Sequence, residues 1–288
     1  MSAQHPIIGY TLGDQAGIGP EVIKAALAQL PENAEYRLIG KEIDCTPGQP
    51  TESTAQAALE HLELAAAALR NGEIDAVVTA PVCKESLHRI GFAYPGQTEF
   101  FADRMGVKDF AMCLTGRRLT VALCTTHVAL ADVPRQLQTA EIVRIGSLLA
   151  NFLQRTGKPA PRIALAGLNP HNGENGAFGN EEKTLIAPAL PLLRAAIPSA
   201  EFCGPCVPDC VYRDAAQGLY DGIVAPYHDQ ALIPLKLIDF DTAVNATIGL
   251  PRLRVSPDHG TAFNIAGRGI ANPASTLRAF QVALSSVI

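Results

Sequence analysis

Short apolar runs rich in β-branched residues alternate along this chain with longer segments of helical periodicity, and this alternation limits the fold more than any other feature. It is typical of a parallel or mixed sheet flanked by helices, so the predicted class is α/β. Most runs are continuously apolar, as expected of strands covered on both faces. The predicted strands are Ile7–Leu12, Tyr36–Ile39, Ala76–Thr79, Phe110–Leu114, Thr120–Cys124, Ile163–Gly167, Gly222–Ala225 and Ala243–Ile248.

Five segments carry the helical pattern. They are Pro20–Leu30, Ala55–Arg70, Thr139–Arg155, Glu181–Ala196 and Pro273–Ser285. For the last helix, Asn272 is the expected N-cap and Pro273 the expected first helical residue. The segment Asp44–Ser53 is rich in Pro, Thr and Gly, which predicts a surface connection.

Composition excludes several classes of protein. The chain has 288 residues, of which 48% are hydrophobic and 18% charged, enough for one large domain or two compact lobes. A net charge of -5, with no basic stripe, argues against a nucleic-acid partner. The first residues lack a secretory signal pattern and no apolar run reaches the roughly 18 residues that span a bilayer, so no membrane association and a cytoplasmic location are expected.

The seven cysteines are odd in number and unevenly spread, which indicates reduced thiols rather than a disulfide framework. Three of them, Cys203, Cys206 and Cys210, lie close together in CGPCVPDC. A closed zinc site needs four ligands, and no second pair lies nearby. The interpretation is therefore structural, with thiols packed as small hydrophobes.

Three of the seven histidines share one placement. His127, His171 and His228 each follow an apolar strand, in LTVALCTTH, IALAGLNPH and DGIVAPYH. Ligands of open α/β sheets bind beyond the carboxyl ends of the strands, so three imidazoles at one edge form a candidate metal site. For any single histidine the alternative is a hydrogen-bonded loop residue.

Two glycine-containing segments and one polar group are further candidates. GDQAGIGPEV, residues 13–22, lacks the third Gly of the Rossmann fingerprint, so its turn at a helix N-terminus suits either an anionic ligand or close packing. HGTAFNIAGRGIANP, residues 259–273, permits close approach to a flat or phosphorylated ligand or is merely a tight turn. Lys236, Asn245 and Arg254 could bind a carboxylate or phosphate, or be solvated surface groups.

Together these motifs resemble the 4-hydroxythreonine-4-phosphate dehydrogenase family of pyridoxal phosphate biosynthesis and its close relatives. The matching stretches run from residue 13 to 269 in the expected order. They are GDQAGIGPE, TAPVCKESLHRIGFAYPGQTEFF, TTH, GLNPHNGENG, YHDQALIPLK, NATIGLPRLR and DHGTAFNIAGRG. The resemblance implies the two-lobed fold of the isocitrate and isopropylmalate dehydrogenases, with mixed sheets flanked by helices. It also implies a homodimer that shares active sites across its interface.

The resemblance carries roles over to matching positions. The metal ligands would be His127, His171 and His228. Substrate contacts would be Gln97, Thr98, Lys236, Asn245 and Arg254. The dinucleotide would contact His259, Gly260, Thr261, Asn264, Gly267 and Asn272. The expected division is a first lobe of residues 1–80 and 262–288, with both termini and the dinucleotide loop, and a second lobe of residues 81–261, with the metal site and dimer interface.

Two departures from the family pattern bear on substrate and cofactor. Gln97 stands where the family has a histidine, and its amide can neither carry charge nor shuttle protons. The stretch between Ile39 and Ala55 is also shorter than in the family. Relatives of this family act on phosphorylated threonate or erythronate, or on a dihydrodiol acid. Asn264 stands where related enzymes hold the ribose with an acidic residue, so NAD is expected and NADP is the alternative.

The expected reaction is metal-dependent oxidation of 4-phosphohydroxy-L-threonine to a β-keto acid, which loses CO2 to give 3-amino-2-oxopropyl phosphate. One divalent metal ion, zinc or else magnesium or cobalt, would lower the pKa of the substrate hydroxyl. Lys236 and Arg254 would bind the anionic end of the substrate, with Asp209 and Asp229 as candidates for proton handling. The alternatives are a metallohydrolase using the same three histidines, and a binding protein that has lost turnover.

Overall fold

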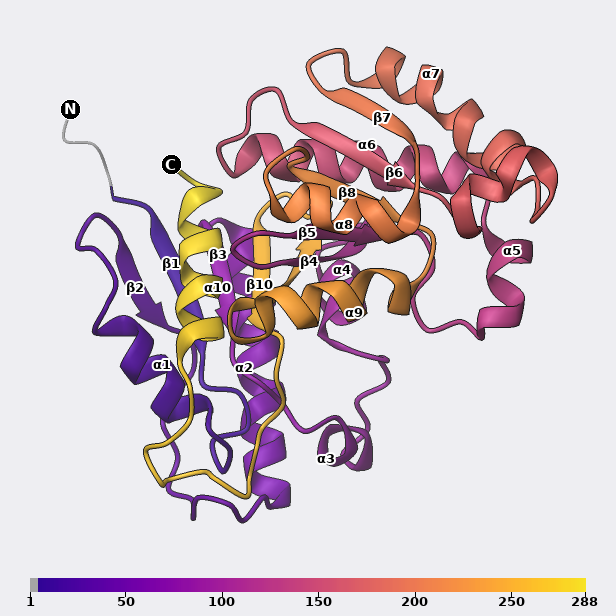
Figure 1. The fold of residues 1–288 in the computed structure, drawn as a ribbon. Helices are drawn as coiled ribbons and strands as arrows, with labels where there is room; N and C mark the ends of the chain where they lie inside the picture. The colour runs from indigo at the N-terminus through magenta and orange to yellow at the C-terminus, as the bar shows by residue number, and fades with distance from the viewer. Residues whose placement is uncertain (1–4) are drawn as a thin grey trace. The chain divides into compact units, whose positions relative to one another are not determined.

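The structure is a computed structural model that describes residues 5–288, and the chain forms two compact units (Figure 1). The first unit runs to Phe110 and resumes over Val244–Ile288, and the second is Ala111–Ala243. This division differs from the expected one, because residues 81–110 and 244–261 fall in the first unit. The reason is strand pairing: residues 244–257 supply two strands to the sheet that contains residues 76–79.

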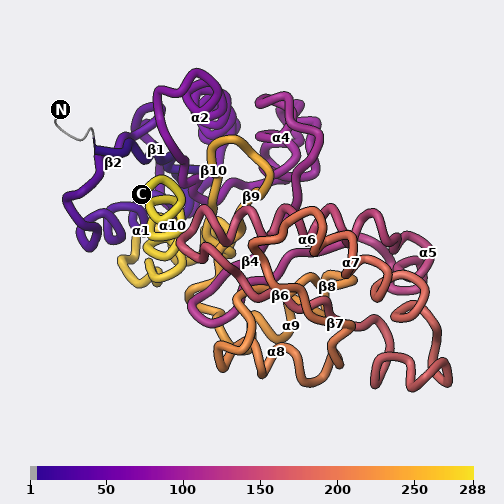
Figure 2. Tube along the Cα trace, turned by 90° about the horizontal axis from the view of Figure 1, so that it is seen from above, coloured from indigo at the N-terminus to yellow at the C-terminus, as the bar shows by residue number. Residues whose placement is uncertain are grey.

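The first unit holds five neighbouring strands. Their order is β2 (Glu35–Leu38), β1 (Ile7–Thr11), β3 (Ala76–Thr79), β10 (Leu253–Pro257) and β9 (Val244–Ile248). β9 is antiparallel to β10, and the other neighbours are parallel. Figure 2 shows α2 (Glu52–Asn71) on one face, and α1 (Gly19–Leu27) and α10 (Ala274–Ser285) on the other.

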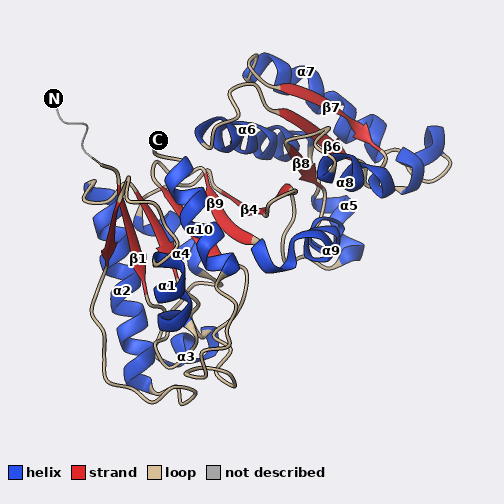
Figure 3. Cartoon of the chain, turned by 60° about the vertical axis from the view of Figure 1, so that its left-hand side comes forward, coloured by secondary structure: helices blue, strands red, loops and turns tan. Residues whose placement is uncertain are grey.

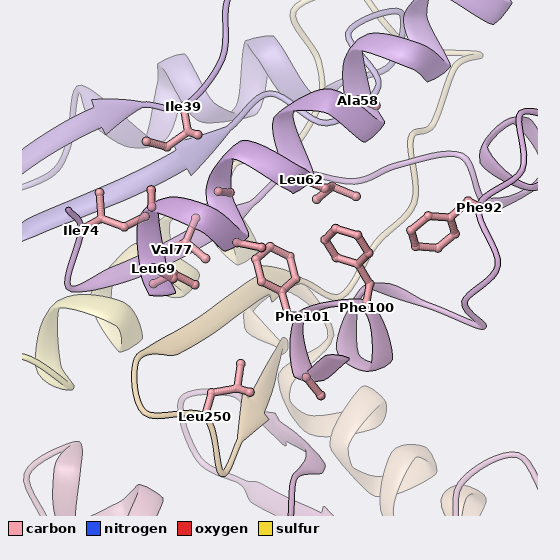
Figure 4. Close-up of a cluster of buried hydrophobic side chains, with 14 of the residues drawn as sticks. Ile39, Ala58, Leu62, Leu69, Ile74, Val77, Phe92, Phe100, Phe101 and Leu250 are labelled. Carbon is pink, nitrogen blue, oxygen red and sulfur yellow. The ribbon is translucent and has the colours of Figure 1, made fainter. Parts of the chain in front are cut away.

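The core of the first unit lies between α2, the sheet and α4 (Gln97–Arg104), which follows the short α3 (Lys84–Arg89). Phe100 and Phe101 of α4 are fully buried and face Leu62 of α2 in Figure 4. Burial of each such side chain contributes about 1.5–3 kcal/mol. This packing fixes the first turn of α4, which carries Gln97 and Thr98.

The second unit holds five further strands. Its strands are β4 (Ala111–Thr115), β5 (Thr120–Leu123), β8 (Gly222–Ala225), β6 (Arg162–Ala166) and β7 (Glu201–Cys206), in this spatial order. β4 is antiparallel to β5, and the others run parallel. α6 (Thr139–Arg155) and α7 (Ala187–Ala196) lie on one face, and α8 (Pro208–Ala216) and α9 (His228–Asp239) on the other (Figures 2 and 3). The short elements are α5 (Val133–Gln136), η1 (Leu130–Asp132), η2 (Pro170–Gly176), the π-helical turn η3 (Glu182–Ile186) and η4 (Phe240–Thr242).

The α/β class with mixed sheets flanked by helices is confirmed, and the eight predicted strands are present within one or two residues of their expected bounds. β7, β10 and five of the helices were not predicted. The expected start of α10 was wrong by one residue: Pro273 is the N-cap, and the backbone N–H of Ala274 donates to Asn272 Oδ1 at 3.0 Å. Within residues 5–288, no helix is both long and apolar enough to cross a membrane.

Candidate functional site

Three neighbouring parallel strands of the second unit each lead to one predicted metal ligand. His127 follows β5, His228 follows β8 and His171 follows β6, and β8 lies between the other two. Because the carboxyl ends of parallel strands open at one edge, the three segments leave the sheet together. The structure thus confirms the strand arrangement from which the histidine site was predicted.

Hydrogen bonds join the three histidine segments to one another. Thr125, two residues before His127, donates its N–H and its Oγ1 hydroxyl to the carbonyl of Pro226, at 3.2 and 2.8 Å. Gln230, two residues after His228, donates Nε2 to the carbonyl of Gly167 at 2.7 Å, just beyond β6. These polar neighbours therefore fix the spacing of the loops that carry the imidazoles.

His127 and His228 form a close pair, with ring centroids 5.7 Å apart. His228 Nδ1 lies 2.7 Å from Asp229 Oδ1. A carboxylate at Nδ1 favours the tautomer with a proton there, which leaves Nε2 unprotonated and able to bind a cation. Asp229, expected as a candidate for proton handling, is thus placed to orient an imidazole.

His171 is carried by a loop with an unusual backbone conformation. It opens a left-handed stretch in η2, where every residue from His171 to Asn175 has a positive φ, and its exposed Nδ1 is 3.7 Å from Glu174 Oε2. Across residues 5–288, no three His, Cys, Asp or Glu side chains are grouped so that they could hold a metal ion. The donor types suit zinc, and two of the three imidazoles are already adjacent.

Arg254 of β10 is a buried cation in the first unit, only 2% exposed. Its Nε and Nη2 donate to Thr79 Oγ1 at 3.0 and 2.8 Å, and its guanidinium lies over the Phe101 ring. Burial lowers the pKa of Arg254 to about 9, which the charge of Glu99 opposes. Within the described chain no carboxylate forms an ion pair with it. Buried charges are normally paired, so this guanidinium is suited to an anionic ligand.

Other predicted substrate contacts lie around Arg254. Thr247 of β9 is its cross-strand partner and donates to Thr98 Oγ1 at 3.4 Å. Asn245 shares the face of Thr247, two residues along the strand. The amide oxygens of Gln97 and Asn245 are buried without a hydrogen-bond partner. The first unit therefore combines a cation, a helix N-terminus and two unused acceptors.

The predicted dinucleotide loop, residues 259–273, is irregular and belongs to the first unit. Gly260, Asn264, Gly267 and Asn272 are exposed, as a ligand would require. His259 Nδ1 is 3.1 Å from the Gly260 carbonyl, while its Nε2 is buried without a partner. Thr261 is half-buried and accepts a hydrogen bond from the Ile18 N–H at 2.9 Å.

The glycine-containing turn at the start of α1 packs closely against neighbouring backbone and leaves no space there for an anionic ligand. A Cβ at Gly19 would lie 2.1 Å from the Leu12 carbonyl oxygen, and one at Gly17 would lie 2.7 Å from that of Thr261. Of the two interpretations of GDQAGIGPEV, the structure favours close packing. A pocket of about 580 Å³ adjoins this turn, and Glu21, which lines it, accepts a hydrogen bond from the Gly269 N–H.

The remaining candidates lie in the second unit. Lys236 is exposed on α9, and Asp209 is exposed in the first turn of α8. The three clustered cysteines are free thiols, and burial raises the pKa of both Cys203 and Cys206, which favours the protonated form. Sequence reasoning overlooked Thr79, the partner of Arg254, and Glu182, a buried carboxylate beside the His171 segment.

Comparison with known proteins identifies the family of this chain. The family model described as pyridoxal phosphate biosynthetic protein PdxA matches residues 15–283. A 4-hydroxythreonine-4-phosphate dehydrogenase from Erythrobacter litoralis is 46% identical, over 97% of this chain and 96% of its own. A D-threonate 4-phosphate dehydrogenase from Pectobacterium atrosepticum is 38% identical, over 96% of this chain and 98% of its own.

A solved structure gives the same result for the fold. The crystal structure of 4-hydroxythreonine-4-phosphate dehydrogenase from Klebsiella pneumoniae has a TM-score of 0.82 and 36% identity, covering 98% of this chain and 99% of its own. Both the sequence relatives and this structure are dehydrogenases that act on hydroxyl groups. The chain therefore belongs to the PdxA family of dehydrogenases.

Proposed function

We propose that this protein oxidises the hydroxyl group of a small phosphorylated hydroxy acid and transfers the hydride to NAD or NADP. The first candidate substrate is 4-phosphohydroxy-L-threonine, on which the Erythrobacter and Klebsiella relatives are named to act. The second is D-threonate 4-phosphate, the named substrate of the Pectobacterium relative. The oxidation product is a β-keto acid, which loses CO2 to give, from the first substrate, 3-amino-2-oxopropyl phosphate.

The observation that carries this proposal is the unpaired, buried guanidinium of Arg254. A phosphate or carboxylate would form the ion pair that this guanidinium lacks, and the first turn of α4 would add the positive end of a helix dipole. Thr98 offers a hydroxyl at the same place. Lys236 would bind the anionic end of the substrate from α9.

The two unused amide oxygens are compatible with the second candidate substrate. Gln97 and Asn245 can accept hydrogen bonds but carry no charge. They would accept from a hydroxyl as readily as from an amino group, so an acid with a hydroxyl at C2 fits as well as an amino acid. This is why both substrates belong in the first assay.

The residues for cofactor and metal follow from their placement. The exposed glycines and Asn264 of loop 259–273 would bind the dinucleotide, and neutral Asn264 repels neither NAD nor NADP. His127, His171 and His228 would hold one divalent ion, zinc or else magnesium or cobalt, which when bound polarises the substrate oxygen. Asp229 holds Nδ1 of His228, and Asp209 remains a candidate for proton handling.

We also propose a homodimer that shares its active sites. The supporting observation is a row of exposed apolar side chains along α9 and η4, formed by Ile233, Leu237 and Phe240, the last two 82% and 71% exposed. Ile233 and Leu237 are four residues apart in α9 and so share one helical face, and Phe240 follows in η4. A face of this kind, on the helix that carries Lys236, fits a second copy of this chain.

The test is the absorbance of reduced nicotinamide with zinc-loaded protein, NAD or NADP, and each of the two substrates. We expect zinc-dependent reduction with one of them. His171→Ala should lose zinc binding and turnover together, whereas His88→Ala, an exposed histidine on α3, should keep both. Full activity of His171→Ala would refute the metal assignment. Ester hydrolysis without nicotinamide reduction would favour a metallohydrolase, and tight substrate binding without turnover a binding protein.

A further inference from the structure

We propose that Glu182 is a positioning residue, whose buried carboxylate holds the segment that carries His171 in its left-handed conformation. The inference rests on the proposed metal role of His171. Glu182 begins the π-helical turn η3, yet its carboxylate is directed to the backbone beyond β6. No motif in the sequence indicated this role.

The segment that carries His171 needs external support. His171, Asn172, Glu174 and Asn175 are L-residues with φ between 43° and 57°, and Gly173 between them also has a positive φ. Side chains disfavour this left-handed region, and runs of several such residues are uncommon. Strained backbone of this kind persists only where the surroundings fix it.

Glu182 supplies that support at the entrance to the segment. It is 4% exposed. Its Oε1 accepts the backbone N–H groups of Leu168 at 2.8 Å and Asn169 at 2.6 Å, and its Oε2 accepts from Asn169 Nδ2 at 3.1 Å. One carboxylate therefore fixes the two residues that precede Pro170 and His171.

The interior of the turn closes against the same carboxylate. A Cβ at Gly173 would lie 3.0 Å from Glu182 Oε2 and 2.6 Å from the Gly179 carbonyl oxygen. Asn172 donates Nδ2 to the carbonyl of Pro205 in β7 at 2.8 Å. The turn is thus held at its entrance by Glu182 and in its middle by β7, which leaves the His171 ring as its exposed projection.

The neighbouring Glu181 is a natural control. It contacts the same residue, Asn169, but only through the side-chain amide, at 2.7 Å. It makes none of the backbone contacts that Glu182 makes at Leu168 and Asn169. A comparison of the two carboxylates separates backbone positioning from general charge near the loop.

The experiment is zinc titration by calorimetry of the full chain, with thermal unfolding measured in parallel. Glu182→Ala should weaken zinc affinity by roughly 10–100-fold, as loss of partners behind metal ligands does. Glu182→Gln should recover much of it, because the amide oxygen can still accept both backbone N–H groups. Glu181→Gln should stay within about threefold of the wild type, and saturating zinc should restore turnover of Glu182→Ala.

A second pair of variants tests the turn without touching the carboxylate. Asn175 is exposed with φ 57°. Asn175→Gly suits this conformation and should leave zinc affinity unchanged, whereas Asn175→Val opposes it and should weaken binding. Wild-type affinity in Glu182→Ala or in Asn175→Val would overturn the positioning role alone. A wild-type protein that binds no zinc would overturn the metal proposal as well.

Discussion

Arg254 combines two properties that oppose each other energetically. Its burial without an anionic partner costs folding free energy, and the same unpaired charge is what would bind a phosphorylated substrate. Arg254→Met keeps the volume and removes the charge. We expect its free energy of unfolding, measured in urea, to be unchanged or higher by about 1–4 kcal/mol.

Binding should change in the opposite direction for the same variant. Loss of charged hydrogen bonds worth about 1.5–3 kcal/mol should raise the Kd of the phosphorylated substrate roughly 10–150-fold. Calorimetry with the substrate and with inorganic phosphate measures this. A variant that unfolds more easily yet binds as tightly as the wild type would show that Arg254 is a structural residue.

At the scale of single residues, the sequence could indicate groups that carry chemistry but not the partners that fix them. The histidines were identified because each follows a recognisable strand. Thr79 could not be linked to Arg254, because the two are 175 residues apart in the chain. In the sequence Glu182 is one acidic residue in a polar stretch, and only the fold shows that it is buried. Hydrogen-bond partners of buried groups are properties of the tertiary structure.

At the scale of elements, strands covered on both faces were predictable because their composition is uniform. β3 and β8, AVVT and GIVA, have the predicted bounds. β10 was missed because LRVSP places the buried Arg254 inside a strand, and β7 because EFCGPC contains Gly and Pro. α9 was missed because Pro234 lies inside it. The exceptions are thus elements in which a functional or connecting residue interrupts the usual pattern.

The connection after β2 contacts a buried histidine, His61, which predicts that the stability of the fold depends on pH. His61 of α2 is buried, and its Nε2 accepts the Lys41 N–H at 3.1 Å, which requires an unprotonated nitrogen. Burial lowers the pKa of His61 below 6.5, and the charge of Lys41 adds to this against the opposing effect of Glu60. The unfolded chain therefore binds the proton more readily, and stability present above pH 6.5 is lost as the pH falls below that value.

His61→Gln retains an acceptor for the Lys41 N–H but cannot take up a proton. We expect its melting temperature to fall less than that of the wild type between about pH 7 and pH 5, the range in which histidine titrates. Differential scanning calorimetry across this range provides the comparison. Parallel curves for the two proteins would mean that His61 does not contribute to the acid sensitivity of the fold.

At the scale of the whole molecule, the exposure of Ile233, Leu237 and Phe240 on α9 and η4 has no explanation in a single isolated chain. Single exposed apolar residues are common, and Leu192 on α7, 53% exposed, is one of them. Ile233, Leu237 and Phe240 differ because they follow one another at short intervals along α9 and the 3-10 helix η4 directly after it. A dimer interface typically buries about 1,200–2,000 Å² and is most apolar at its centre.

Leu237→Lys places a charge at the centre of this face, and Leu192→Lys makes the same change elsewhere in the second unit. Because both side chains are exposed, neither change should lower the melting temperature of the subunit appreciably. By light scattering after size exclusion, we expect the wild type and Leu192→Lys to be dimers and Leu237→Lys to be a monomer without turnover, since the active sites are proposed to be shared. A dimeric Leu237→Lys would place the interface on another face, and a monomeric wild type with full activity would remove the shared site from the proposal.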